Sequence, residues 1–124
     1  MKIMFSAGEV SGDLHGARLA QAILAQAPEM ELVGFGGREM AQAGVTLAAD
    51  FASYNVMGVW EVLKNLGRIR RLLQRLTDFM REERPDLLVL IDYPDFNWRL
   101  AARAKKLGIP VFSYIPPSAW AWRK

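Results

Sequence analysis

The sequence contains no cysteine and only one histidine, His15. Without cysteine the chain cannot form disulfides, use a thiol nucleophile or bind a metal through thiolates. A Ser-His-Asp triad would have to use His15, and a histidine-rich metal site cannot be built. No apolar run reaches the ~18 residues of a membrane-spanning helix, and the first such run, stopped by Glu9, is too short for a signal peptide. These absences predict a cytoplasmic protein.

Net charge is also small, at +3 over 124 residues that are 52% hydrophobic and 23% charged. Such a composition is typical of a folded globular protein, and the length suits one domain with a real core. The excess positive charge is concentrated in one stretch, which contains Lys64, Arg68, Arg70, Arg71, Arg75, Arg81 and Arg84. A solvated helix face explains this cluster most simply, and an anionic partner is the alternative.

Short apolar runs alternate with helical patterns along the whole chain. Strands are expected at residues 2–6, 31–35, 45–49, 87–91 and 109–113. Helices are expected from Ser11 to Pro28, over 38–43, from Val59 to Pro85 and over 96–107, with a loop at 50–58. This alternation predicts an α/β fold with a Rossmann-like parallel β-sheet flanked by helices and right-handed crossovers.

The junction between the first strand and the first helix, from Gly8 to Asp13, is rich in groups that bind ligands. Backbone N–H groups and the helix dipole converge at such a junction. Its glycines match neither the dinucleotide nor the P-loop pattern, and the carboxylates of Glu9 and Asp13 would repel a pyrophosphate. Hydroxyl-rich groups such as sugar rings suit it better. The alternative is that Ser11 and Asp13 cap the helix while Gly8 and Gly12 relieve a tight turn.

A second candidate site follows the most apolar strand, at residues 87–91. Asp92 lies at the rim of this strand, where partial desolvation would raise its pKa and make it a better general base for a hydroxyl nucleophile. Asp95 and Asn97 come just beyond it. The alternative is that Asp95 caps the next helix and Asp92 braces the turn at Pro94.

A third candidate follows the last strand, where Tyr114, Pro117 and Trp120 belong to a stretch of prolines and indoles. Rigid prolines and indole rings can stack on a sugar or support a loop. Packing of the indoles against another segment explains them equally well.

The segment from Asp50 to Val62 carries apolar residues, and they show no clear period as far as Gly58. A peripheral enzyme could use such a loop, next to a basic helix, to draw a lipid from an anionic membrane surface. The residues expected at the membrane or the acyl chains are Val56, Met57, Val59 and Trp60. The alternative is a loop that folds back onto the core or is covered by another segment.

Taken together, these stretches resemble the lipid-A-disaccharide synthase family of glycosyltransferases. The resemblance covers the whole chain and rests on five motifs in the same order. They are Ala7–Ala17, Gly34–Gly37 with Met40 and Gly44, Val56–Leu63, Ile91–Asn97 and Tyr114–Arg123. Pro116 and Arg38 depart from the usual pattern, which affects the local loop shape.

The resemblance implies a GT-B-type enzyme of two Rossmann-like halves, of which residues 1–124 are part of the N-terminal, acceptor-side half. The UDP-sugar-binding half is then absent. The implied reaction is the inverting transfer of 2,3-diacylglucosamine from UDP to 2,3-diacylglucosamine 1-phosphate, without a cofactor or an obligate metal. Asp92 would be the catalytic base. Gly8, Glu9, Ser11, Gly12, Asp13, Asp95, Asn97, Tyr114, Pro117 and Trp120 would bind substrate.

The implied partners are the two lipid substrates, UDP-diacylglucosamine and diacylglucosamine 1-phosphate, and an anionic membrane surface, with no nucleic acid. The implied location is peripheral, on the cytoplasmic face of the inner membrane. We expect the isolated chain to be inactive because it lacks groups that stabilise the leaving UDP. Two alternatives remain, a non-catalytic α/β binding module and another sugar-nucleotide-using enzyme. The sequence leaves the oligomeric state open.

Overall fold

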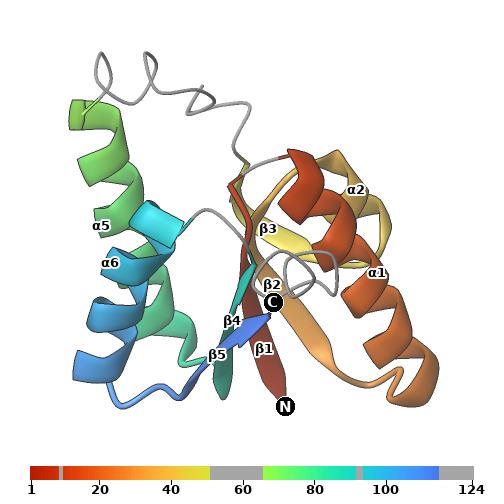
Figure 1. Cartoon of the computed structure of the whole chain (residues 1–124). Helices are drawn as coiled ribbons and strands as arrows, with labels where there is room; N and C mark the ends of the chain where they lie inside the picture. The colour runs from red at the N-terminus through yellow and green to blue at the C-terminus, as the bar shows by residue number, and fades with distance from the viewer. Residues whose placement is uncertain (9, 51–65, 92–93, 115–124) are drawn as a thin grey trace, which may run out of the picture.

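A computed structural model gives the structure of the protein and describes residues 1–8, 10–50, 66–91 and 94–114 (Figure 1). Its strands are β1 (Lys2–Ser6), β2 (Glu31–Gly36), β3 (Thr46–Asp50), β4 (Leu87–Ile91) and β5 (Val111–Tyr114). Its helices are α1 (Val10–Gln26), α2 (Arg38–Gln42), α5 (Leu66–Glu83) and α6 (Pro94–Lys106). The expected α/β fold class is therefore confirmed.

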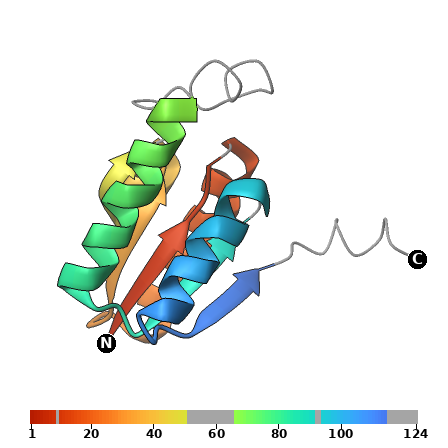
Figure 2. The same cartoon turned by 90° about the vertical axis from the view of Figure 1, so that its left-hand side faces the viewer.

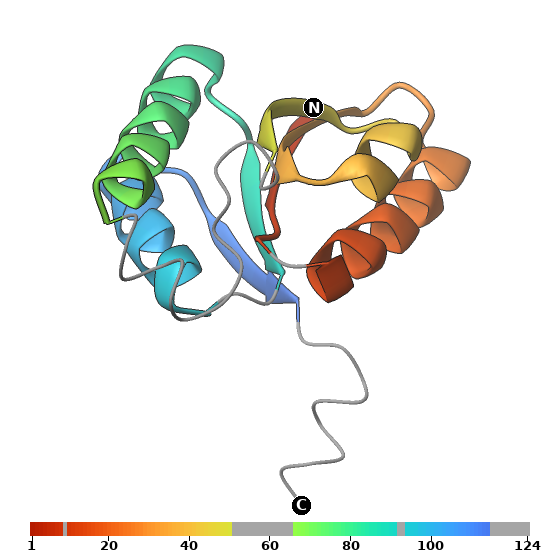
Figure 3. The same ribbon diagram turned by 90° about the horizontal axis from the view of Figure 1, so that it is seen from above.

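The strands form one sheet in the order β3-β2-β1-β4-β5, and every neighbouring pair is parallel. The chain therefore starts in the middle of the sheet, builds one half through β2 and β3, and then crosses to the other side of β1 to build β4 and β5. Figures 1 and 3 show the result as three layers, with α1 and α2 on one face of the sheet and α5 and α6 on the other. This is a doubly wound arrangement.

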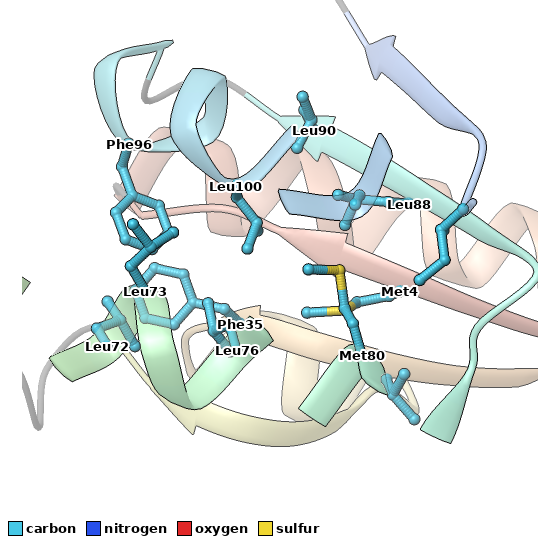
Figure 4. Packing of buried hydrophobic residues seen from close by; sticks show 13 residues of the cluster. Met4, Phe35, Leu72, Leu73, Leu76, Met80, Leu88, Leu90, Phe96 and Leu100 are labelled. Carbon is cyan, nitrogen blue, oxygen red and sulfur yellow. The ribbon is translucent and has the colours of Figure 1, made fainter. Parts of the chain in front are cut away.

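Each face of the sheet has its own hydrophobic core because successive residues of a strand point to opposite sides. On β1, Met4 belongs to the core beneath α5 and α6, whereas Ile3 and Phe5 belong to the core beneath α1 and α2. The first core is closed by α5 and α6 residues such as Leu76 and Leu100 (Figure 4). Burial on both faces explains why the central strands are continuous apolar runs.

Two helix boundaries differ from the expectation in a way that bears on capping. Helix α1 begins at Val10, so Ser11 lies inside its first turn. Helix α6 begins at Pro94, whose fixed φ suits the first helical position, so Asp95 lies inside the helix as well. The expectation that Ser11 or Asp95 precedes and caps its helix is therefore wrong. The expected helix from Val59 is described only from Leu66, as α5, and the expected loop over 51–58 lies outside the described residues.

Close packing accounts for the glycines around β2. Gly34 has a φ of +151°, and a Cβ there would overlap the backbone carbonyl oxygen of Phe5 on the neighbouring strand. A Cβ on Gly36 would overlap the sulfur of Met40, and one on Gly16 of helix α1 would lie 2.7 Å from the same sulfur. Met40 therefore fills the space between α1, α2 and the sheet only because both positions lack a side chain.

Lys2, at the start of β1, joins the two halves of the fold at the end of the sheet opposite the carboxyl ends of the strands. Its ammonium group lies 2.7 Å from Glu83 and 3.7 Å from Glu31. Its backbone N–H donates to the Asp86 carboxylate over 2.8 Å. The hydrogen bond to Glu83 raises the pKa of Lys2, and desolvation opposes this rise.

Candidate functional site at the carboxyl ends of β1 and β4

The reversal of strand order between β1 and β4 places two of the candidate stretches side by side. The chain leaves β1 toward α1 on one face of the sheet and leaves β4 toward α6 on the other face. The first turns of these two helices therefore lie on opposite faces of the sheet. The region beyond the carboxyl ends of the two strands, here called the crevice, is the usual ligand site of doubly wound sheets. Residues 7, 8, 10–13, 91 and 94–97 lie at this end of the sheet, and β5 ends there at Tyr114.

Asn97 links the two sides of this crevice. The Ser6 hydroxyl at the end of β1 donates to Oδ1 of Asn97 over 2.6 Å, and Nδ2 of Asn97 donates to the Ser6 backbone carbonyl over 3.1 Å. Ser6 is fully buried and Asn97 is only 2% exposed. Asn97 thus fixes the first turn of α6 to the end of β1, and the substrate contact expected for it stays a prediction.

Asp13 also has a structural partner. Its Oδ1 accepts hydrogen bonds from the backbone N–H groups of Gly37 at 2.8 Å and Met40 at 3.0 Å, and its Oδ2 accepts one from Glu39 at 3.0 Å. The N-cap residue of α2 is Gly37, which has no side chain to cap the helix. Asp13, 4% exposed, supplies that cap from helix α1. The substrate contact expected for Asp13 stays a prediction.

The remaining junction residues lie close to the crevice with different exposure. Gly8 and Gly12 are buried, whereas Ser11 is exposed in the first turn of α1. Tyr114 is partly buried and packs against the core beneath α1 and α2. Of these residues, Ser11 offers a hydrogen-bonding side chain to solvent beside the crevice.

Eight of the predicted site residues fall in the gaps between the described ranges or after the last of them. Glu9, Asp92, Pro117 and Trp120, together with Val56, Met57, Val59 and Trp60, lie outside the described residues. Asp95 belongs to the first turn of α6. Ser6 was not predicted as the partner of Asn97, although a serine that ends an apolar strand is a usable signal for such a contact.

A second hollow lies away from the crevice, between the edge strand β3 and helix α5. This groove has a volume of about 610 Å³ and is lined by Leu47, Phe79 and charged residues including Arg75 and Glu82. Arg75 donates to the Ala48 carbonyl oxygen through Nε at 3.1 Å and through a terminal guanidinium nitrogen at 3.0 Å. These bonds occupy a backbone acceptor of the edge strand, which protects the edge from pairing with another strand.

Over residues 1–8, 10–50, 66–91 and 94–114, no cluster of three or more histidine, aspartate or glutamate residues is arranged to hold a metal ion. Over the same ranges, no helix combines the length and the apolar character needed to cross a membrane.

The described elements define a Rossmann-like α/β domain with a doubly wound parallel sheet. A glycotransferase of kitacinnamycin has a TM-score of 0.61 at 18% identity, over 98% of this chain and 33% of its own. A UDP-GlcNAc 2-epimerase from Neisseria meningitidis has a TM-score of 0.53 at 18% identity, over 91% of this chain and 32% of its own. At such low identity these similarities establish the fold alone.

The sequence comparisons establish the family. The model of the lipid-A-disaccharide synthetase family matches residues 3–124, and the chain therefore belongs to that family. A lipid-A-disaccharide synthase of Syntrophus aciditrophicus is 50% identical over 98% of this chain, and one of Myxococcus xanthus is 44% identical over 99%. The matched region is 32% of each relative, so the chain spans about a third of their length.

Proposed function

We propose that the protein is a glycosyltransferase that joins two acylated glucosamine units during lipid A assembly. The observation that carries this proposal is the family match over residues 3–124. The donor would be 2,3-diacylglucosamine linked to UDP, and the acceptor 2,3-diacylglucosamine 1-phosphate. The chain would form part of the acceptor-side half of a GT-B-type enzyme, because it spans 32% of relatives that bear the synthase name.

Asp92 is the proposed catalytic base. In the sequence it comes directly after β4, whose residues Leu88 to Ile91 are buried, and doubly wound sheets bind ligands beyond the carboxyl ends of such strands. Its carboxylate would take the proton of the acceptor hydroxyl as the oxygen attacks the anomeric carbon of the donor. The bond from that carbon to UDP then breaks, with UDP leaving from the opposite face, which inverts the configuration.

The walls of the acceptor site are proposed to be the junction after β1 and the stretches after β4 and β5. Gly8, Glu9, Ser11 and Gly12 would contribute the first wall; Asp95, Tyr114, Pro117 and Trp120 would contribute the others. Asp13 and Asn97 hold the walls in place through the contacts described above. The same hydrogen bonds support a rigid wall, since a positioned hydroxyl reacts faster than a mobile one.

The substrates of such an enzyme carry acyl chains, and we propose that the protein works as a peripheral protein on the cytoplasmic face of an anionic membrane. Val56, Met57, Val59 and Trp60 would contact the acyl chains or the bilayer. Vesicle co-sedimentation of wild type against a Met57→Asp, Val59→Asp double variant tests this assignment. Equal binding by both proteins would count against it.

The test of the reaction uses the protein at the full length that its gene encodes, with both substrates in detergent micelles. Asp92→Asn and Asp92→Ala should each lower turnover by about 10²- to 10⁴-fold, the usual contribution of a general base. Asp78→Asn, a change of the same kind on the exposed side of α5, should leave turnover unchanged. Near-normal turnover in both Asp92 variants would remove Asp92 from the role of base.

The 124-residue chain alone is expected to make no disaccharide, because no group proposed here stabilises the departing UDP. Disaccharide product from this chain alone would overturn that expectation. If the full-length protein made no disaccharide either, the non-catalytic α/β binding module and another sugar-nucleotide-using enzyme would become the leading alternatives.

A further inference from the structure

The groove between α5 and the edge strand β3 combines an apolar floor with a charged rim. Helix α5 contacts β3, whereas α6 lies over the opposite side of the sheet, against β4 and β5 (Figure 2). On the floor of the groove, Leu47 and Phe79 are partly buried. The α5 residues that line the groove are Arg71, Gln74, Arg75, Asp78, Phe79 and Glu82. Apolar side chains surrounded by charged ones are typical of a protein–protein contact.

The charges of this groove are separated along α5. Its lining residues are spaced as i, i+3, i+4, i+7, i+8 and i+11, so they form one face of the helix. Both arginines come before both carboxylates, and the two ends of the face are about 16 Å apart. One half of the face is therefore positive and the other half is negative.

This pattern is self-complementary under a two-fold rotation. The lining residues of α5 form three pairs that share one midpoint on the helix, namely Arg71 with Glu82, Gln74 with Phe79, and Arg75 with Asp78. When two copies of α5 pack antiparallel about that midpoint, every arginine lies opposite a carboxylate. A parallel alignment in the same register would instead place like charges opposite each other. The face thus matches an antiparallel copy of itself.

The outer pair has charges that are not matched within the subunit. Glu82 is exposed, and among the described residues its carboxylate has neither an ion pair nor a hydrogen bond. Arg71 is also exposed, and its Nε donates to the Gly67 carbonyl over a long 3.3 Å. The two residues are three turns apart on one helix, which is too far for them to pair with each other. An antiparallel second copy would bring them together.

Strand pairing between two copies is disfavoured at the same place. Arg75 donates two hydrogen bonds to the Ala48 carbonyl of β3, over 3.1 and 3.0 Å. A second edge strand would have to displace this guanidinium group before it could pair with Ala48. The contact that suits the groove is therefore helix against helix.

We propose that this groove is a homodimer interface, in which α5 of a second copy of the chain docks antiparallel to α5 of the first. Arg71 would pair with Glu82 of the partner subunit, and Arg75 with Asp78 of the partner subunit. The interface is isologous, so each of these contacts occurs twice. The inference concerns assembly and does not depend on the proposed reaction.

The experiment is sedimentation equilibrium of the full-length protein from about 1 to 100 μM, a range in which modest interfaces associate. Arg71→Glu and Glu82→Arg each place like charges opposite each other at two symmetry-related positions. Each variant alone should raise the dissociation constant of the dimer roughly 10- to 30-fold. Neither change touches the Arg75–Ala48 bonds or the Asp78–Arg81 ion pair.

Two recombinations of these changes should restore the dimer. An equimolar mixture of the Arg71→Glu and Glu82→Arg proteins should form heterodimers, because unlike charges then meet at both positions. The swap Arg71→Glu, Glu82→Arg within one chain should form homodimers for the same reason. Both dissociation constants should return to within about threefold of wild type. A variant that had merely lost its fold would not recover in the mixture.

The controls reverse charges outside the groove. Arg70→Glu changes the residue next to Arg71 on α5, and Glu29→Arg changes an exposed residue in the turn before β2. Both should leave the dissociation constant within about twofold of wild type. Wild type that stays monomeric over the whole range would overturn the proposal and leave the groove to another segment or partner. Equal shifts in controls and groove variants, or no recovery in the mixture and the swap, would overturn it as well.

Discussion

Replacing Asp13 tests whether the junction after β1 is built around the cap that this residue supplies to α2. In Asp13→Ala, three backbone N–H groups at the start of α2 lose their acceptor, and two of the three bonds are buried. A hydrogen bond to a charged group contributes about 1.5–3 kcal/mol, and unsatisfied buried donors add a desolvation cost. Because the three bonds share one carboxylate, their contributions do not add fully. We expect a loss of about 3–5 kcal/mol of unfolding free energy.

Asp13→Asn separates the charge from the geometry. Its single oxygen can still accept from Gly37 and Met40, but its amide nitrogen then faces the N–H of Glu39, so two donors meet. We expect an intermediate loss of about 1–3 kcal/mol. The free energies come from urea unfolding followed by tryptophan fluorescence and circular dichroism, at constant m-value.

Glu39→Gln is the control for this pair. It removes a negative charge from the exposed first turn of the same helix without touching the cap, so its cost should stay within about 0.5 kcal/mol. A loss below about 1 kcal/mol for Asp13→Ala, or equal losses for all three variants, would refute the claim that Asp13 organises this junction.

Three further predictions concern contacts elsewhere in the fold. Gly36→Ala should lower the free energy of unfolding by about 1–3 kcal/mol, because the added methyl group overlaps the Met40 sulfur. In a double-mutant cycle with Met40→Ala, which removes that sulfur, Gly36→Ala should be nearly neutral. Ser6→Ala should cost about 1–3 kcal/mol in urea unfolding, since it leaves the buried Oδ1 of Asn97 without the hydroxyl, and Ser6→Thr should recover part of this loss. The raised pKa of Lys2 means that its ion pairs stabilise the protein below the unfolded-state pKa of 10.5 and stop doing so as pH rises through the folded-state pKa. The alkaline loss of thermal stability above pH 10.5 should therefore be smaller in Lys2→Met than in wild type, and equal alkaline slopes would contradict this.

The strands could be predicted because a strand that is buried on both faces of a sheet is a continuous run of apolar residues. Leu87 to Ile91 contains no polar residue, and the structure places it in the sheet as β4 with four of its five residues buried. Parallel pairing could be predicted because strands alternate with helices along the chain, and two parallel neighbouring strands need a crossover connection, usually a helix, between them. The order of the strands did not follow, since neither apolar runs nor helical spacing records which strand lies beside which.

The tertiary partners of the site residues were beyond prediction for the same reason. Ser6 and Asn97 are 91 residues apart, and their hydrogen bonds exist only because β1 and β4 are neighbours. Asp13 was correctly placed in the first turn of a helix, but the helix that it caps is α2 rather than its own. Local patterns identify residue types that suit a cap or a ligand; they do not show which helix N-terminus lies within reach.

The family motifs can now be divided by what holds each residue in place. Gly16, Gly34 and Gly36 are required by packing, and Asp13 is required by the cap of α2. The scaffold therefore accounts for these residues, and they do not by themselves indicate a reaction. Ser11 is exposed beside the crevice and has no such structural demand on it. The chemical case for a sugar transferase thus depends on Ser11 and on the residues after β4 and β5, and variants there should change turnover or substrate binding with little change in stability.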